Sequence, residues 1–147
     1  DDRLDHWTLS TDFIVGFPTE TPEDHARSMA LFREVKPEKA NVTRFSKRPG
    51  TDAADLKGLG GQVKKDRSKE RSTLKREVVA EAYESMVGNR YRVMAVREGT
   101  GDSMKCRDDA YRQIIVRDAD ERGVEPGDTV EVEVTSHQTV YAFGEPV

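Results

Sequence analysis

The chain has 147 residues, of which 35% are hydrophobic and 35% are charged, and its net charge at neutral pH is -4. This length accommodates one modest domain or two small ones. The mean hydropathy is -0.78 and no apolar run is long enough to cross a bilayer, so we expect no membrane-spanning helix.

The chain contains one cysteine, Cys106. One cysteine forms no internal disulfide and is too few for a zinc or iron-sulfur site, so we expect neither within these residues. This cysteine usage is typical of a reducing compartment, and we expect a cytoplasmic protein. The first residues, Asp1-Asp2-Arg3, carry neither an initiator methionine nor a signal-peptide pattern, which favours a piece of a longer protein.

The first predicted elements form a β-α-β unit. Residues 8–15 are largely apolar and β-branched and precede a Gly-Phe-Pro turn, which predicts a buried strand of the parallel type. Thr21 as N-cap and Pro22 at the first helical position predict a helix that ends before Pro37. A second strand is expected over residues 40–45. Two parallel strands leave exposed edges and one uncovered sheet face, so we expect neighbouring strands from elsewhere.

A different pattern occupies the second half of the chain. Residues 62–87 contain no Gly or Pro and are followed by Gly88-Asn89, which predicts a long polar helix. Short β-rich runs separated by Gly, Asp and Pro turns follow. They cover residues 91–96, 113–116, 129–134 and 139–143. Four or five strands in about 60 residues predict a small barrel or meander, so the fold class is α/β followed by all-β.

Positive charge is concentrated in residues 62–80. This stretch holds seven basic and three acidic side chains, a net charge of +4 in an otherwise acidic chain. Such a cluster is suited to contact phosphates, but a solvated helix face with i,i+4 pairs is the more common explanation. Both interpretations remain open.

Two separated motifs occur in the order found in one enzyme family. Residues 11–24 read TDFIVGFPTETPED and residues 44–54 read RFSKRPGTDAA. In these motifs the chain closely resembles the radical-SAM methylthiotransferases. Its strand-rich end, which finishes YAFGEPV, is similar to the TRAM domain that closes those enzymes. The final Gly-Glu-Pro-Val looks most like the archaeal and eukaryotic branch, which modifies N6-threonylcarbamoyladenosine beside the tRNA anticodon.

The resemblance implies three parts. Residues 1–61 correspond to the end of a partial radical-SAM β/α barrel, residues 62–88 to a connecting charged helix, and residues 89–147 to a TRAM-like RNA-binding β-barrel. Thr19 stands where the family usually has Gly, which alters the turn if that position needs a positive φ. The CxxxCxxC motif of the family is not in these residues, which favours the last part of a longer enzyme.

In the intact family enzyme, the resemblance implies S-adenosylmethionine, two 4Fe-4S clusters and the addition of a methylthio group to C2 of N6-threonylcarbamoyladenosine at tRNA position 37. Because the cluster ligands are not in this chain, we expect no catalytic residue here and no activity from the isolated chain. The expected partner is tRNA, and neither DNA nor a membrane is expected.

By the same resemblance, the end of the first strand lies at the mouth of the barrel, where S-adenosylmethionine sits. The candidate cofactor-binding residues are Thr11, Asp12, Ile14 and Gly16. Ile14 and Val15 are more simply explained as core. Asp12 is the better candidate, because a carboxylate in an apolar strand needs a partner or a purpose.

Two groups of residues are candidates for RNA binding. Arg44 and Arg48 flank the end of the second strand, where they are suited to hold a phosphate or carboxylate or, equally, to form a surface ion pair. In the barrel, cations beside an aromatic ring are suited to grip RNA and stack bases. These barrel candidates are Arg90, Arg92, Lys105, Arg107, Tyr111 and Arg112. The net charge of residues 89–147 is -4, so either one face is basic or the acidic surface serves solubility at high salt.

Two other functions remain open. The chain is also suited to be a stand-alone RNA-binding module, with the β-α-β part merely structural. Alternatively, it belongs to the branch that methylthiolates an aspartate of a ribosomal protein, which also ends in a TRAM-like domain. An upstream CxxxCxxC motif distinguishes an enzyme from a binding module, and a comparison of tRNA with ribosomal protein as substrates distinguishes the two branches.

Overall fold

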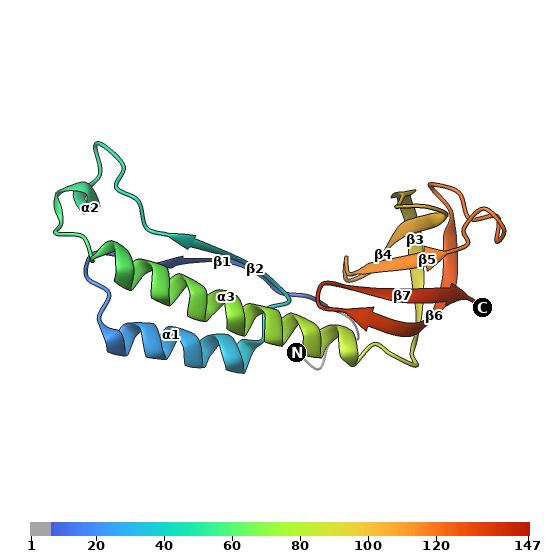
Figure 1. Cartoon of the computed structure of the whole chain (residues 1–147), viewed down its shortest axis with the longest axis horizontal. Helices are drawn as coiled ribbons and strands as arrows, with labels where there is room; N and C mark the ends of the chain where they lie inside the picture. The colour runs from blue at the N-terminus through green and yellow to red at the C-terminus, as the bar shows by residue number, and fades with distance from the viewer. Residues whose placement is uncertain (1–6) are drawn as a thin grey trace. The chain divides into compact units, whose positions relative to one another are not determined.

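The computed structural model describes residues 7–147 (Figure 1). The chain divides into two compact units, Leu9–Val78 and Val79–Val147, and the second also includes Trp7 and Thr8. We call them the α/β unit and the barrel unit. The predicted fold class is confirmed, because an α/β segment with a long helix precedes a five-stranded mixed β-barrel.

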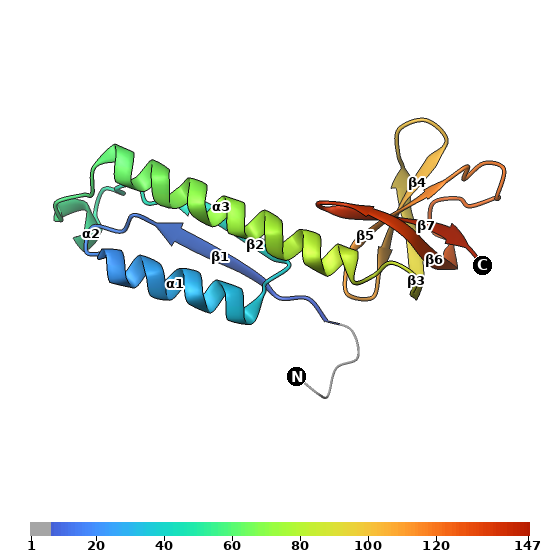
Figure 2. The ribbon, with the colours of Figure 1, turned by 60° about the horizontal axis from the view of Figure 1, so that its bottom comes forward.

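The α/β unit begins with a parallel β-α-β arrangement. It comprises β1 (Ser10–Val15), α1 (Pro22–Val35) and β2 (Lys39–Arg44). The two strands pair in parallel, and the register runs from Ser10 opposite Lys39 to Val15 opposite Arg44. In Figure 1, α1 and the long helix α3 (Gly61–Glu84) lie on the same side of the strands, and Figure 2 shows β1 between these two helices. One face of this sheet is therefore covered and the other is open.

Alternation along β1 decides which side chains are covered. Phe13 packs against Phe32 of α1 with ring centroids 5.2 Å apart, and Val15 is 0% exposed. Asp12 and Ile14 point to the open face, and Ile14 is 60% exposed. The expectation that Ile14 belongs to the core is therefore wrong, whereas that for Val15 is confirmed. The apolar run suggested burial on both faces, but the described residues cover only one.

The start and stop signals of α1 are confirmed. The Thr21 hydroxyl accepts a hydrogen bond from the Asp24 backbone N–H at 3.1 Å, and the Asp24 carboxylate accepts one from the Thr21 N–H at 3.0 Å. This reciprocal capping box satisfies two N–H groups that the first turn leaves unpaired. The helix ends at Val35, and its C-cap, Lys36, adopts a left-handed conformation with φ 47° directly before Pro37.

The remaining helices differ slightly from the predicted ones. A short helix, α2 (Asp52–Asp55), forms in a segment that resembles a loop in sequence. The long helix α3 (Gly61–Glu84) ends earlier than residue 87, because the Met86 and Val87 N–H groups donate to carbonyls three residues back and tighten the last turn. The first part of α3 packs on the sheet through Leu74 and Val78. Its last part belongs to the barrel core.

Five strands close the barrel. They are β3 (Arg90–Glu98), β4 (Ser103–Asp108), β5 (Gln113–Arg117), β6 (Thr129–Gln138) and β7 (Tyr141–Pro146). Their order around the barrel is β3-β4-β5-β7-β6, and only the β5–β7 pair is parallel. Inward side chains such as Val93, Ile114 and Val132 are at most 1% exposed. Among the described residues, no helix is long and apolar enough to cross a membrane.

Sequence patterns did not predict β4. Its inward side chains are Met104, Cys106 and Asp108, all buried, whereas Lys105 and Arg107 point outward. The strand alternates with the period of two that a half-buried strand requires. Its charged outward residues gave it a polar composition, which concealed that alternation.

Candidate functional site

The loop after β1 is fixed by a carboxylate. Gly16 is buried and has φ +76°, and its backbone N–H donates to Oε2 of Glu20 at 2.6 Å. A positive φ favours glycine at this position. Thr19 does not adopt a positive φ, so a threonine in place of the family's usual glycine is compatible with this turn.

Glu20 also joins the loop to both helices. Its Oε2 accepts a hydrogen bond of 2.6 Å from Nη1 of Arg67 on α3, and its Oε1 lies 3.8 Å from Nδ1 of His25 on α1. The other ring nitrogen of His25 lies 3.0 Å from a carboxylate oxygen of Glu70. These contacts hold the end of β1 in one position relative to α1 and α3.

The structure separates the four candidate cofactor residues. Asp12 and Ile14 lie on the open face of the sheet, whereas Thr11 is half-buried on the face that carries Phe13. Gly16 lies beyond the strand, in the loop. Only Asp12 and Ile14 therefore share an exposed surface.

A hollow of about 490 Å³ lies at the C-terminal ends of β1 and β2. Its lining includes Ile14, Thr43 and Phe45 together with Arg44 and Arg48. Neither arginine forms an ion pair with a described residue, so the surface ion pair considered for them does not occur in residues 7–147. Two guanidinium groups beside an apolar wall suit a ligand that combines an anionic group with an apolar or aromatic part.

Some basic side chains of residues 62–80 are buried and contribute to packing inside the α/β unit. Arg71 is 1% exposed, and its guanidinium carbon lies 4.4 Å from the centroid of the Phe13 ring. Burial lowers the pKa of Arg71, and the negative charges of Glu20 and Glu70 offset part of this effect. Together with Arg67, this side chain stabilises the α/β unit and is not presented to solvent.

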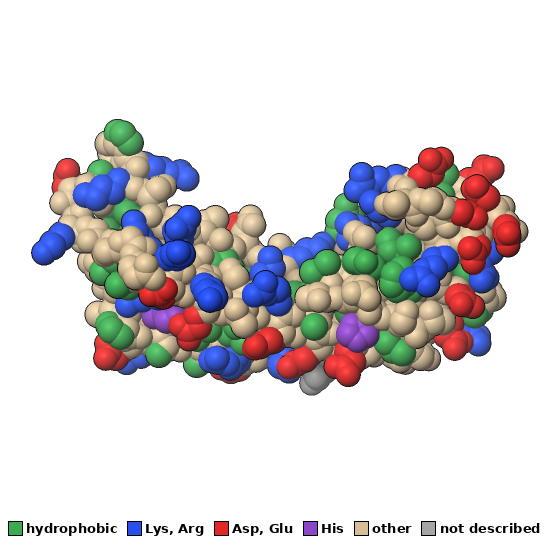
Figure 3. Space-filling view, viewed as in Figure 1, with side chains coloured by type: hydrophobic (Ala, Val, Ile, Leu, Met, Phe, Trp, Pro, Cys, Tyr) green, Lys and Arg blue, Asp and Glu red, His purple; other side chains and the backbone are tan. Residues whose placement is uncertain are grey.

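Other cations of the same stretch remain at the surface. Lys65 and Lys69 line a hollow of about 560 Å³ together with Arg44 of β2. Figure 3 shows Lys and Arg side chains gathered over α3 on this face of the unit. The positive charge predicted for residues 62–80 is therefore divided between the interior and the surface.

Three of the predicted barrel cations are paired with carboxylates. Arg90 lies 3.2 Å from Glu133, and Arg92 lies 3.7 Å from Asp109. Arg112 is held more firmly, because both its Nε and its backbone N–H donate to the buried Asp108, at 2.8 and 2.7 Å. These carboxylates neutralise much of the charge that the sequence suggested for an RNA-binding face.

Arg107 and Tyr111 form a unit at the turn between β4 and β5. The guanidinium carbon of Arg107 lies 4.8 Å from the centroid of the Tyr111 ring, and Nη1 donates to the Tyr111 carbonyl at 3.1 Å. Tyr111 is 62% exposed and has φ 64°. A cation therefore holds an aromatic ring at the surface, which is an arrangement suited to base stacking.

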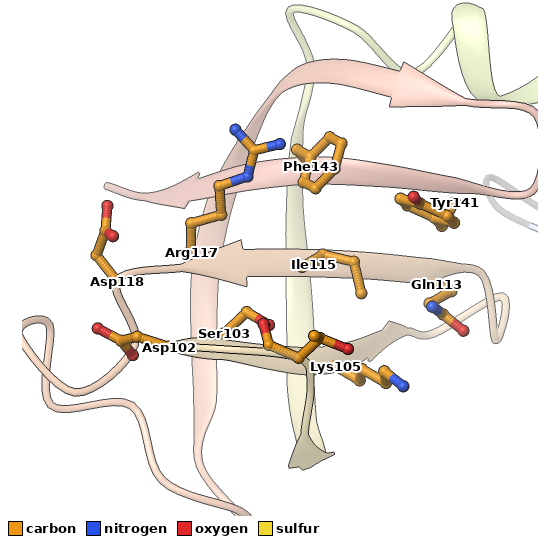
Figure 4. Close-up of a pocket in the computed structure, with 10 residues that line it drawn as sticks. Asp102, Ser103, Lys105, Gln113, Ile115, Arg117, Asp118, Tyr141 and Phe143 are labelled. Atoms are coloured by element: carbon orange, nitrogen blue, oxygen red, sulfur yellow. The ribbon is translucent and has the colours of Figure 1, made fainter.

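A second cation–aromatic group lies on the outer face of β4, β5 and β7. It lines a hollow of about 510 Å³ (Figure 4). Lys105, Ile115 and Phe143 are register partners across the three strands. The guanidinium carbon of Arg117 lies 3.9 Å from the centroid of the Phe143 ring, and the Tyr141 and Phe143 centroids are 5.4 Å apart with ring planes at 86°.

Of this second group, sequence reasoning identified only Lys105. Arg117, Tyr141 and Phe143 were missed, although the run Tyr-Ala-Phe-Gly at residues 141–144 carries a usable signal. Ala142 and Gly144 are small and buried, so the alternation of a strand places both aromatic rings on the outer face.

Residues 7–147 contain no candidate metal-binding site. No group of three or more His, Cys, Asp or Glu side chains in this range is arranged to hold a metal ion. Cys106 is 0% exposed, and burial raises the pKa of its thiol to about 11. The described residues therefore do not fit the iron-sulfur clusters that the resemblance implies for the intact enzyme.

An α/β segment joined to a five-stranded mixed barrel is consistent with the end of an enzyme that closes in a TRAM domain. No protein-family model matches the chain. The chain is homologous to the C-terminal part, about 30%, of the threonylcarbamoyladenosine tRNA methylthiotransferases. The resemblance in the two motifs and the closing module is thereby confirmed.

Individual relatives cover nearly the whole chain. A probable threonylcarbamoyladenosine tRNA methylthiotransferase of Archaeoglobus fulgidus is 36% identical over 97% of this chain and 32% of its own length. One of Pyrococcus horikoshii is 34% identical over 93% of this chain and 31% of its own length. A tRNA-2-methylthio-N(6)-dimethylallyladenosine synthase of Streptomyces viridosporus is 35% identical over 90% of this chain and 27% of its own length. The chain thus spans about a third of the length of these relatives.

Among solved structures, a conserved protein of Methanococcus maripaludis matches 42% of this chain and 79% of its own, at 30% identity and a TM-score of 0.35.

Proposed function

We propose that this chain is the C-terminal part of an enzyme that adds a methylthio group to C2 of N6-threonylcarbamoyladenosine in tRNA. In this proposal the open face of the α/β unit contributes to the S-adenosylmethionine site, and the barrel unit binds tRNA. The observation that carries the proposal is the similarity of nearly the whole chain to the archaeal threonylcarbamoyladenosine tRNA methylthiotransferases.

The chemistry of the open sheet face suits S-adenosylmethionine. Asp12 offers a carboxylate for an ammonium group, Arg44 and Arg48 offer guanidinium groups for a carboxylate, and Ile14 offers an apolar contact. When bound, S-adenosylmethionine supplies the radical and methyl-transfer chemistry, while residues of this chain only bind and orient it. Gly16 contributes by holding the loop beside the strand end through its bond to Glu20.

In the barrel, the proposed tRNA contacts differ in availability. Among the described residues, Arg107 and Lys105 have no carboxylate in ion-pair contact, and Arg107 holds the exposed Tyr111 at the surface. Arg90, Arg92 and Arg112 each already contact a carboxylate, which offsets part of their attraction for a phosphate. We therefore assign the first three the larger share of the binding free energy.

A second substrate has a specific observation in its favour. The Streptomyces viridosporus relative, a 2-methylthio-N(6)-dimethylallyladenosine synthase, is almost as similar to this chain as the archaeal relatives are. Both substrates are adenosines modified at N6, so the same tRNA-binding barrel serves either.

A chimera tests the proposal. The C-terminal part of the Archaeoglobus fulgidus relative is replaced by this chain, and tRNA nucleosides from a host that makes both modified adenosines are analysed by mass spectrometry. We expect the methylthio derivative of N6-threonylcarbamoyladenosine. The methylthio derivative of N6-dimethylallyladenosine instead would assign the second substrate. Ribosomal-protein peptides from the same cells are analysed as well, and a methylthiolated aspartate there would assign the other branch.

The same chimera tests the cofactor face. Asp12→Ala is expected to reduce product at least tenfold, whereas Ser10→Ala, a change on the same face at the start of β1, is expected to retain it. A folded chimera that makes no product while the parent enzyme does would contradict the proposal. In that case, retained tRNA binding by this chain would favour the stand-alone RNA-binding module.

A further inference from the structure

We propose that the hollow on the outer face of β4, β5 and β7 binds one unpaired RNA nucleotide, whose base stacks in the aromatic group formed by Tyr141 and Phe143 and whose phosphate is held by Lys105. Because it takes RNA as the ligand of the barrel, the proposal rests on the function proposed above.

The aromatic pair provides the stacking surface. Tyr141 and Phe143 are alternate residues of β7 and are both half-buried, with ring planes at 86° and centroids 5.4 Å apart. Ile115 lies beneath them on β5 as an apolar floor and is 7% exposed. Figure 4 shows the two rings along one wall of the hollow, and Figure 3 shows hydrophobic side chains gathered over β5 and β7. Base–aromatic stacking tolerates any sequence, because every base has a π-face.

Arg117 extends this surface. Its guanidinium carbon lies 3.9 Å from the Phe143 centroid, so a planar cation already covers part of the ring. A guanidinium plane is itself a platform for a nucleobase. Arg117 and Lys105 form no ion pair with a described residue, in contrast to Arg90 and Arg92 on β3. Both cations are therefore available to a ligand.

The hollow is electrostatically polarised. In Figure 4, Lys105 and Gln113 lie at one end and Asp102 and Asp118 lie at the other. A phosphate is attracted to the lysine end and repelled from the aspartate end, which sets the direction of the RNA backbone. The four ionic groups, counting Arg117, sum to zero, so affinity depends on stacking more than on net charge. The volume of about 510 Å³ is within the range of small-ligand sites and accommodates a nucleotide.

Stacking and phosphate contacts respond differently to salt, which makes the proposal testable. The probe is a single-stranded hexaribonucleotide with one 2-aminopurine, whose fluorescence falls when the base stacks. It is titrated with the whole 147-residue chain at several salt concentrations.

Phe143→Leu and Tyr141→Leu are expected to weaken binding by about 5- to 150-fold, as loss of one stacked base implies, with the salt slope unchanged. Lys105→Ala is expected to reduce the salt slope by about 0.7, as loss of one phosphate contact to a single strand implies.

Two further variants separate stacking from effects on folding. Tyr141→Phe keeps the ring and is expected to bind the probe and quench its fluorescence as the unchanged chain does. Met94→Ala removes apolar surface from β3, where the side chain is 55% exposed, and is expected to leave binding unchanged. If a leucine variant unfolds, the salt slope of Lys105→Ala still decides the outcome, because a slope equal to that of the unchanged chain would contradict the site.

Binding of tRNA by each variant is measured in parallel. If the unchanged chain binds tRNA but the two leucine variants bind the probe equally well, the stacking site is wrong and the proposed function stands. If the unchanged chain binds neither tRNA nor the probe, RNA binding by the barrel is itself wrong.

Discussion

Oε2 of Glu20 lies 2.6 Å from Nη1 of Arg67, and both side chains are only 11% exposed. Through this pair, and through the bond from the Gly16 N–H to the same oxygen, α3 holds the loop at the end of β1. The strand end that carries the proposed cofactor face therefore depends on a largely buried ion pair.

Breaking this pair is predicted to destabilise the chain. Glu20→Gln leaves Arg67 largely buried without its counter-charge, and we expect the free energy of unfolding to fall by about 1–3 kcal/mol. Urea denaturation followed by circular dichroism measures it. Glu77→Gln, at an exposed position of α3, is the matched control and is expected to change stability by less than about 0.5 kcal/mol. Equal stabilities of the two variants would contradict the role of the pair.

Much of the fold was predictable because local signals agree with the tertiary structure. The capping box at Thr21 and the stop at Pro37 set the limits of α1 by local chemistry alone. The exposure of Ile14 was not predictable from its apolar run, because it depends on which strands and helices surround β1. The strand β4 was missed because its outward face is charged, although its inward face is apolar enough to join the barrel core.

Closure of the barrel is predicted to depend on Gly144. A Cβ at this position would lie 3.0 Å from Ile114 Cγ2 and 3.1 Å from Val132 Cγ2, between the two strands that flank β7. We expect Gly144→Ala to destabilise the chain by about 1–3 kcal/mol through overpacking. The control Gly60→Ala meets nothing within 4 Å and is expected to be neutral or slightly stabilising. Thermal unfolding of both variants provides the comparison, and a neutral Gly144→Ala would show that the barrel expands without cost.

The thiol of Cys106 is predicted to be inert in the folded chain. Burial raises its pKa from 9.0 to about 11, so about one thiol in a hundred to a thousand is ionised at pH 8 to 9. We expect no reaction with an aromatic disulfide reagent at pH 8 until urea unfolds the chain, after which one thiol reacts. Because the folded pKa is the higher one, this group favours the folded state below pH 9 and loses that contribution as pH rises toward 11. Rapid labelling of the folded chain would place Cys106 at the surface instead.

The cap of α1 predicts a pH dependence on the acid side. Hydrogen bonds from the Thr21 backbone N–H, and then from its hydroxyl, lower the pKa of Asp24 below 3.8. The ionised carboxylate therefore stabilises the folded state above pH 3.8, and this contribution is lost as pH falls through the folded pKa. We expect Asp24→Asn to be less stable than the unchanged chain at pH 6, and the difference to disappear near pH 2. A difference that persists at pH 2 would assign the effect to packing instead of charge.

The candidate sites were less predictable than the fold. Arg90 and Arg112, which the sequence suggested as RNA contacts, are both paired with carboxylates. Arg90 pairs with Glu133, which is distant in the sequence. Arg112 pairs with Asp108, which lies in β4, the strand that sequence patterns did not predict. Arg117 was overlooked because its partner, Phe143, meets it only across the parallel β5–β7 pairing. A parallel pairing between strands far apart in sequence leaves no local signal.

The central claim is that the barrel binds tRNA, and its most direct test is the affinity of the 147-residue chain for tRNA at rising salt concentration, with double-stranded DNA of similar length as the control. The predicted result is binding to tRNA that is tighter than to DNA and weakens linearly on a log–log plot, with a slope that falls when Arg107 is replaced by Ala. Absence of tRNA binding, or equal binding to DNA with a slope that Arg107→Ala does not change, would contradict the account.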